Sequence, residues 1–239
     1  MEICQFYSRL SRNPTGADLK ALSKRRDDLV KALSKFNSDS RKYLGANAFS
    51  EISGWESDPD DDFEDEEGDP TDCPTHMRDH RPELSPIALP SGIPVASRHR
   101  ILLQGLCEKE LELRIGFTND ALAGIRATLG QKAFHYRKGL RVARTKIHQT
   151  RARTTIQAVH RNLVLQARIY SRSRLALKRL GIDAAILEAH YQVMKKTDIH
   201  VSATLTDPNR QGSSQLTLSW IWCVQQGVRP TDNYLTECE

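Results

Sequence analysis

Positive charge without negative charge is the first chemical signal in the sequence. Between Ala121 and Ile182 there is no Asp or Glu, although Arg and Lys recur every few residues and number fifteen. The formal net charge of the whole chain is only +5. Cations at such spacing can neutralise nucleic-acid phosphates, and Tyr136, His160 and Tyr170 in the same stretch can stack on bases or donate hydrogen bonds. The stretch therefore predicts nucleic-acid binding.

Six arginines are the candidate contacts. In a helix, positions 161, 168, 172 and 179 fall nearly in line on the face opposite the apolar stripe, and two more arginines precede them. The candidate nucleic-acid-binding residues are Arg151, Arg153, Arg161, Arg168, Arg172 and Arg179. Contacts to phosphates position a protein without reading bases, so the expected partner is DNA bound without sequence preference.

A solvated outer face is the alternative interpretation of this charge. Long helices need soluble residues outside, and the counter-charge lies in the run Glu56 to Asp72, which has eleven acids and no base. A helix that needs only solubility usually mixes both signs, which the basic stretch does not. Leu165 and Leu175 lie near the arginine face, so a third element, such as the N-terminal helix, is expected to cover part of it. Both interpretations stay open at the level of sequence.

The other groups with chemical potential predict neither catalysis nor a cofactor. Cys73, His76 and His80 have a spacing that suits zinc, but a fourth ligand is missing nearby, so we expect no metal. The acids at positions 60–62 are adjacent, whereas a two-metal nuclease takes its acids from separated positions on a rigid scaffold. No Gly-rich phosphate loop and no Ser/His/Asp grouping occurs. We expect no enzyme and no small-molecule substrate.

The cellular location is expected to be the nucleus or the cytoplasm. No run of about eighteen apolar residues is present to cross a membrane. The first twelve residues lack the apolar core of a signal peptide. The five cysteines are odd in number and scattered, which is typical of a reduced compartment.

Three long helices have to position the basic residues. The first is expected over 17–44, with Thr15 or Asp18 as its cap and a basic outer face. The second, about 108–137, keeps its apolar phase through Gly130 and stops at Gly139. The third, 147–181, ends at a glycine. A short turn between the second and third predicts an antiparallel hairpin. The predicted stripes are Leu111, Ile115, Thr118, Leu122, Ile125, Leu129, Ala133 and Tyr136, and Ile156, Val159, Leu163, Ala167, Tyr170, Arg174 and Leu177.

The regions around the hairpin complete the expected organisation. Residues 1–45 form a basic amphipathic helix, 46–100 an acidic and Pro-rich disordered linker, 101–196 the hairpin with a short helix capped by Asp183, and 197–239 an irregular tail. Apolar residues among the prolines at 82–94 favour docking of that segment on a helix, with free extension as the alternative. The apolar group at 216–222 is a candidate docking segment.

Several runs of residues resemble fungal Kyakuja–Dileera–Zisupton (KDZ) transposase-like proteins. The runs that carry the resemblance include Glu110-x-Glu112-Leu113-Arg114-Ile115, Asn119-Asp120-Ala121-Leu122-x-x-Ile125-Arg126-x-x-Leu129-Gly130-Gln131-Lys132, Ala167-Arg168-Ile169-Tyr170-Ser171-Arg172 and Leu218-Ser219-Trp220-Ile221-Trp222. The resemblance implies a helical region that follows an RNase H-like catalytic core. That core, its acidic triad and the accompanying cysteine clusters have no match here, so the resemblance implies a truncated or domesticated remnant that does not cut DNA.

The resulting prediction is an all-α protein: an elongated antiparallel helical hairpin or coiled coil with a flanking N-terminal helix. Its expected function is that of a non-catalytic, transposase-derived module that binds nucleic acid through a basic helix face. The alternative is a structural or oligomerisation coiled coil that meets a protein partner or a second copy and has no nucleic-acid role.

Overall fold

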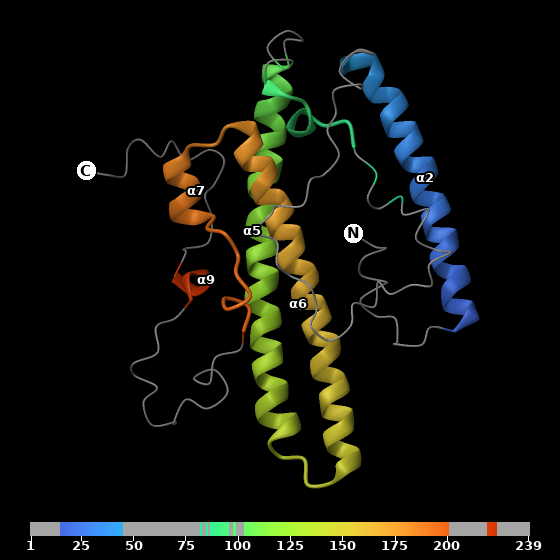
Figure 1. The fold of residues 1–239 in the computed structure, drawn as a ribbon, viewed down its shortest axis with the longest axis vertical. Coiled ribbons are helices and arrows are strands. Elements are labelled where there is room, and N and C mark those ends of the chain that lie inside the picture. The colour runs from blue at the N-terminus through green and yellow to red at the C-terminus, as the bar shows by residue number, and fades with distance from the viewer. Residues whose placement is uncertain are drawn as a thin grey trace. The chain divides into compact units, whose positions relative to one another are not determined.

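The computed structural model describes residues 15–44, 82, 85, 87–95, 98, 103–200 and 219–223. Within these ranges all regular structure is helical and no strand occurs, which confirms the all-α prediction (Figure 1). The acidic run Glu56 to Asp72, the residues Cys73, His76 and His80, and most of the expected tail lie outside the described residues. The elements are α2 (Gly16–Leu44), η3 (Pro90–Gly92), α5 (Gln104–Phe134), η4 (His135–Leu140), α6 (Lys146–Leu180), α7 (Ala184–His190) and α9 (Trp220–Cys223). The chain divides into two compact units, 1–110 and 111–239, and each is described by itself.

The N-terminal helix α2 begins with a reciprocal cap. Thr15 donates to Asp18 Oδ2 from its hydroxyl at 2.6 Å and from its backbone N–H at 2.9 Å. Asp18 N–H donates back to Thr15 Oγ1 at 3.3 Å, as in a capping box. The bond from the Thr15 hydroxyl, with that from the backbone, holds the pKa of Asp18 below its usual range. Both residues named as cap candidates therefore act together.

Residues 87–95 dock through a buried carboxylate in the first unit. The turn η3 places Ser91 so that its N–H donates to Glu110 Oε2 at 2.8 Å and its hydroxyl donates to Oε1 at 2.6 Å. Glu110 is 7% exposed, and a carboxylate at that depth needs such donors. A small apolar cluster beside it contains Leu44, Ala88, Ile93 and Leu103. This part of the expected disordered linker is packed, which agrees with the favoured interpretation that the segment docks on a helix.

The hairpin of the second unit has one constant antiparallel register. Facing positions on its two arms are 118 and 173, 124 and 166, 132 and 160, and 139 and 152. As the residue number rises along the first arm, the number of the facing residue on the second arm falls by a similar amount. Figure 1 shows α5 and α6 side by side and joined at the lower end of the view. The predicted antiparallel hairpin is confirmed.

Local sequence explains where the arms end. Thr145 caps the start of α6, with its hydroxyl accepting from His148 N–H at 3.3 Å. Gly181 ends that helix at φ 88°, a backbone conformation that residues with a side chain rarely adopt, and its N–H donates to Leu177 O.

The first arm ends differently from the prediction. A π-helical turn, η4, follows α5, and Arg141 N–H donates to Tyr136 O at 3.0 Å.

The predicted apolar stripes form the seam of the hairpin. All of the following residues are 9% exposed or less: Ile115, Leu122, Ile125, Leu129, Ala133, Ile156, Leu163, Ala167, Tyr170 and Leu177. A polar layer interrupts them, because Thr118 Oγ1 donates to Ser173 Oγ at 2.7 Å and both hydroxyls lie within hydrogen-bond distance of Arg114 O. Burying the apolar side chains drives the two helices together, at roughly 25 cal/mol for each Å² removed from water.

The Thr118–Ser173 layer should show measurable coupling between the two arms. We expect Thr118→Val and Ser173→Ala each to lower the free energy of unfolding by about 1 kcal/mol. The double variant should lose less than the sum by roughly 0.5–1 kcal/mol, because each single change leaves the other hydroxyl with a poorer set of partners. Urea denaturation of the four proteins measures this cycle. Additive losses would mean that the two hydroxyls do not stabilise each other.

Segments after α6 pack on the hairpin through their backbone carbonyls. Asp183 caps α7 by accepting from Ala185 N–H at 3.0 Å, as predicted. The sequence predicted a helix over Ala184 to Lys195, but α7 ends earlier, at His190. Arg174 Nε then donates to Tyr191 O, and Tyr170 Oη donates to Gln192 O, each at 2.7 Å.

Residues 219–222 of the apolar group in the tail are also docked. Arg126 Nε donates to Ile221 O at 2.7 Å, Ile221 is fully buried, and the rings of Tyr170 and Trp220 lie 5.9 Å apart. The four-residue helix α9 therefore belongs to the second unit, and the tail is not irregular at this point.

Candidate nucleic-acid interface

The six predicted arginines do not form one uniformly open stripe. Arg151, Arg153 and Arg172 are exposed, whereas Arg161, Arg168 and Arg179 are half-buried. The Nε of Arg161 is buried and finds no hydrogen-bond acceptor among the described residues. The open end of the row thus lies at the start of α6, and toward the end of that helix exposure alternates with partial burial.

Two further cations of the basic stretch have structural roles. The Nε–H groups of Arg126 and Arg174 each donate to a backbone carbonyl of the docked segments, so these donors are not available to a phosphate. The expectation that Tyr170 stacks on bases is wrong, because Tyr170 is fully buried in the seam. Burial raises the pKa of its phenol above the ordinary value, so it stays a neutral donor to Gln192 O. Nothing in the fold brings that ring to the surface.

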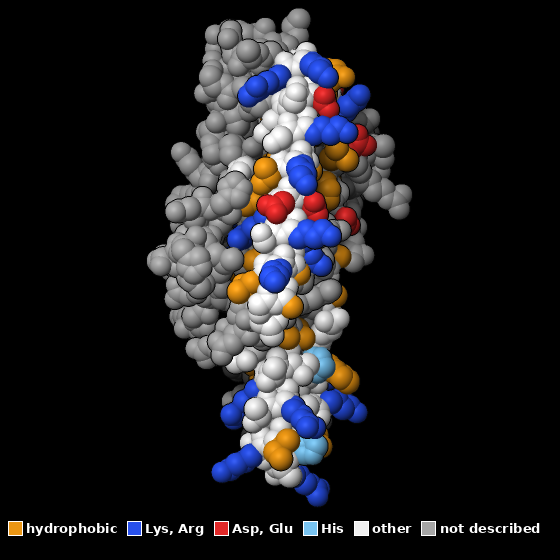
Figure 2. Space-filling view, turned by 90° about the vertical axis from the view of Figure 1, so that its right-hand side faces the viewer, with side chains coloured by type: hydrophobic (Ala, Val, Ile, Leu, Met, Phe, Trp, Pro, Cys, Tyr) orange, Lys and Arg blue, Asp and Glu red, His pale blue; other side chains and the backbone are white. Residues whose placement is uncertain are grey.

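A group of exposed cations without any acid among them lies where the two arms meet. We call residues 134–155, from the last residue of α5 to the third turn of α6, the hairpin end. Figure 2 shows Lys, Arg and His side chains, and no Asp or Glu, at the lower end of the view, where the two arms join. All seven of its cations are exposed: Arg137, Lys138, Arg141, Arg144, Lys146, Arg151 and Arg153. Only the last two belong to the set that the sequence predicted.

No carboxylate of the hairpin helices lies close enough to screen these charges. Asp120 is fourteen residues before Phe134 on α5, or about 21 Å at 1.5 Å per residue. Asp183 lies beyond the end of α6 at Leu180, which is itself twenty-five residues after Thr155, or about 37 Å along the helix. The Debye length is about 8 Å at physiological ionic strength. The cations of the hairpin end therefore repel one another without relief from either acid, and an anionic ligand would remove that repulsion.

Four of these cations have side chains that make no hydrogen bond or ion pair within the described structure. No hydrogen bond or ion pair involves the side chains of Arg144, Lys146, Arg151 or Arg153 in the part of the chain that the structure describes. Their donors are available to a ligand without breaking an internal contact. An arginine presents a planar fork that suits phosphate oxygens, and a lysine offers a compact point charge.

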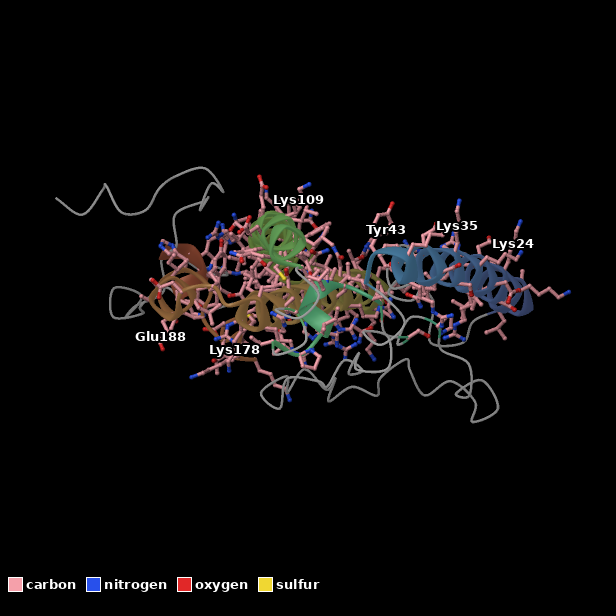
Figure 3. All side chains as sticks on the ribbon, turned by 90° about the horizontal axis from the view of Figure 1, so that it is seen from above. Lys24, Lys35, Tyr43, Lys109, Lys178 and Glu188 are labelled. Atoms are coloured by element: carbon pink, nitrogen blue, oxygen red, sulfur yellow. The ribbon has the colours of Figure 1, made fainter. Side chains whose placement is uncertain are left out.

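The basic face of α2 has a different character. Its exposed lysines share the helix with Asp27, Asp28 and Asp39, and Lys42 Nζ pairs with Asp39 Oδ1 at 2.9 Å. Lys24 and Lys35 point outward from this helix (Figure 3). Mixed signs are typical of a solvated helix face. The same view shows Lys178 and Glu188 pointing outward from α6 and α7, so acid and base are also mixed beyond the far end of α6.

The structure adds no sign of metal or membrane chemistry. Among the described residues, no three His, Cys, Asp or Glu side chains are grouped to hold a metal ion. None of the helices in those ranges has a stretch long and apolar enough to cross a membrane. Comparison of the chain with family models, with curated proteins and with solved structures finds no match.

Proposed function

We propose that the chain is a non-catalytic helical module that binds nucleic acid through the hairpin end, without sequence preference. The observation that carries the proposal is the hairpin end itself, with seven exposed cations and no acid in the basic stretch around them. A helix built only for solubility would carry both signs, as α2 does.

The width of the hairpin end supports contact with phosphates and not with bases. Packed helices lie about 8–10 Å apart, and each is about 10–12 Å across with its side chains. Two arms together are therefore roughly 20 Å wide, whereas the major groove of B-DNA is about 12 Å wide. Such an end would lie across the sugar–phosphate backbone, where contacts fix position but carry no sequence information.

The resemblance to KDZ transposase-like proteins supports the same proposal from another direction. A helical region that once accompanied a DNA-cutting core would meet DNA in the nucleus, which is the location that we propose, with the cytoplasm as the alternative. The observation that tests this origin is the reading frame upstream of the codon for Met1. An adjacent frame that encodes an RNase H-like core is the expected result, and unrelated sequence there would contradict the origin.

Exposed apolar side chains favour one competing function. Val142 and Ile147 are 65% and 66% exposed at the hairpin end, which suits self-association or a protein partner. Sedimentation across a range of protein concentrations, run beside the binding assay, separates this assembly role from nucleic-acid binding.

Binding to duplex DNA should be steeply salt-dependent and indifferent to sequence. The slope of log affinity against log salt is about −0.9 for each phosphate neutralised, so four to six contacts predict roughly −4 to −5. We expect two 20-base-pair duplexes of unrelated sequence to give the same slope and the same affinity in fluorescence anisotropy. No binding at physiological salt, together with arginine-dependent self-association, would favour the assembly role instead.

A further inference from the structure

Phe134 is an exposed aromatic residue that the hairpin seam does not use. It is 56% exposed at the last position of α5, next to the buried Ala133. The ring of His135 meets it edge to face, with centroids 5.7 Å apart and planes at 77°. This contact limits the freedom of the Phe134 ring and so lowers the entropy that a ligand would have to remove.

The residues one turn before Phe134 leave room beside the ring. Gly130 and Gln131 lie four and three positions earlier on α5, so they share its side of the helix, and both are exposed. Among the described residues, no atom beyond its chain neighbours and the nearby helix backbone comes within 4 Å of the point where a Cβ of Gly130 would lie. A glycine inside a helix is unfavourable relative to alanine, and packing does not explain this one. Because Gly130 has no side chain, the surface one turn before Phe134 leaves space beside the face of the aromatic ring.

Two cations follow Phe134 by about one turn along the chain. Arg137 and Lys138 follow Phe134 by three and four residues, across the start of the π-helical turn, and both are exposed. π-helical turns are uncommon and occur frequently at functional sites. An aromatic side chain beside cations that track a phosphate backbone is the combination used to bind single-stranded nucleic acid, because every base has a face that can stack.

We infer that Gly130, Gln131, Phe134 and Lys138 form a subsite for one unpaired nucleotide. Its base stacks on Phe134 above Gly130, its edge meets the amide of Gln131, and its phosphate meets Lys138. In duplex nucleic acid the bases stack on each other and are closed to this ring, so the subsite favours single strands. The inference rests on the proposed function and adds the class of nucleic acid that the hairpin end prefers.

Phe117 supplies a matched control on the same helix. It is 50% exposed on α5, and the exposed Gly116 directly precedes it, with no described atom beyond its chain neighbours and the nearby helix backbone within 4 Å of its Cβ position. The residue three positions after it is Asp120, an acid in place of the cation that follows Phe134. Similar exposure beside an acid in place of a cation separates stacking at a basic site from the general effect of removing a surface phenyl group.

The test measures affinity for fluorescein-labelled (dT)15, (U)15 and a 15-base-pair duplex by anisotropy on the full chain. We expect Phe134→Ala to weaken binding of both single strands by roughly 5-fold to 100-fold, the value of one stacked base, and to leave duplex affinity and the salt slope unchanged. Phe117→Ala should change none of these. A loss confined to (dT)15 or to (U)15 would restrict the subsite to DNA or RNA and support it for that strand.

A second variant separates stacking from folding. Gly130→Leu should raise the melting temperature, because leucine is the better helix former, and still weaken single-strand binding by filling the space beside Phe134. Equal effects of Phe134→Ala on single strands and duplex, or no effect on either, would overturn the inference while duplex binding kept the proposed function intact. Absence of binding to all three ligands would overturn both.

Discussion

Leu163→Asp is expected to unfold the second unit under conditions where the parent chain is stable. Leu163 is fully buried between the arms of the hairpin, so the substitution places a carboxylate in an apolar seam. Loss of the apolar contacts and burial of an unpaired polar group together cost roughly 3–5 kcal/mol. For a unit of this size the melting temperature should fall by more than about 10 °C. Circular dichroism during a thermal ramp measures the shift.

Gln157→Asp is the matched control for this prediction. Gln157 is exposed on the same helix, so the same side chain enters a solvated position. Arg153 and Arg161 lie four residues to either side of it, and the new carboxylate would gain a few tenths of a kcal/mol from them. We expect a shift of no more than about 2 °C. Equal shifts for the two variants would place the seam on the wrong face of α6.

The pH dependence of the Leu163→Asp deficit follows from the same burial. An apolar site raises the pKa of a carboxyl in the folded state above its unfolded value of about 3.9. The folded state then binds more protons than the unfolded state above that value, so stability falls as the pH rises through the raised pKa. The deficit relative to the parent should therefore be smallest near pH 4 and largest at neutral pH.

The helices and their caps could be predicted because their signals are local. Apolar residues three and four apart define the seam of the hairpin, and the constant antiparallel register follows once the turn is short. Gly181 and Asp183 act within one or two residues of the helix ends that they set. Residues 15–18 hold both halves of a cap. Each of these signals depends on neighbours in the sequence.

Contacts between distant residues escaped the sequence because nothing periodic marks them. Ser91 and Glu110 are nineteen positions apart, and neither belongs to an apolar stripe. Arg126 has the residue type and spacing of a phosphate ligand, yet it donates to a carbonyl of a segment that follows the hairpin. Arg174 also donates to such a carbonyl, and only its place in the predicted apolar stripe indicated that it would be packed. Whether a cation on a helix faces solvent or a backbone carbonyl depends on what packs there.

The candidate interface in the structure differs from the predicted row of arginines for the same reason. The sequence favoured the row from Arg161 to Arg179 because its members are in line, but partial burial removes some of them from open solvent. Tyr170 already belonged to the predicted apolar stripe, and that place in the pattern was the signal for its burial. The cations of the hairpin end have no single helical phase, since they run through a π-helical turn and a loop. A search for charges aligned on one helix face therefore misses five of the seven, all but Arg151 and Arg153.

Replacing four cations of the hairpin end should remove most of the binding to duplex DNA. The variant carries Gln in place of Arg144, Lys146, Arg151 and Arg153, the four that make no contact within the described structure. If each neutralises one phosphate, the salt slope should flatten by about three to four units. At 0.1 M salt that difference corresponds to roughly 1000-fold weaker affinity. The melting temperature should stay nearly unchanged because all four side chains are exposed.

An equal charge change on α2 shows whether position or net charge matters. Lys20, Lys24, Lys31 and Lys35 are exposed, and replacing all four with Gln also lowers the formal net charge from +5 to +1. Glutamine and lysine have similar helix propensities, so this variant should fold as the parent does. We expect its salt slope to change by less than one unit, because the lysines of α2 already share their helix with acids. Anisotropy across a salt series on both variants, with sedimentation on the same samples, gives the answer. The same loss in both would mean that DNA responds to the total charge of the chain, and the hairpin end would then have no special role.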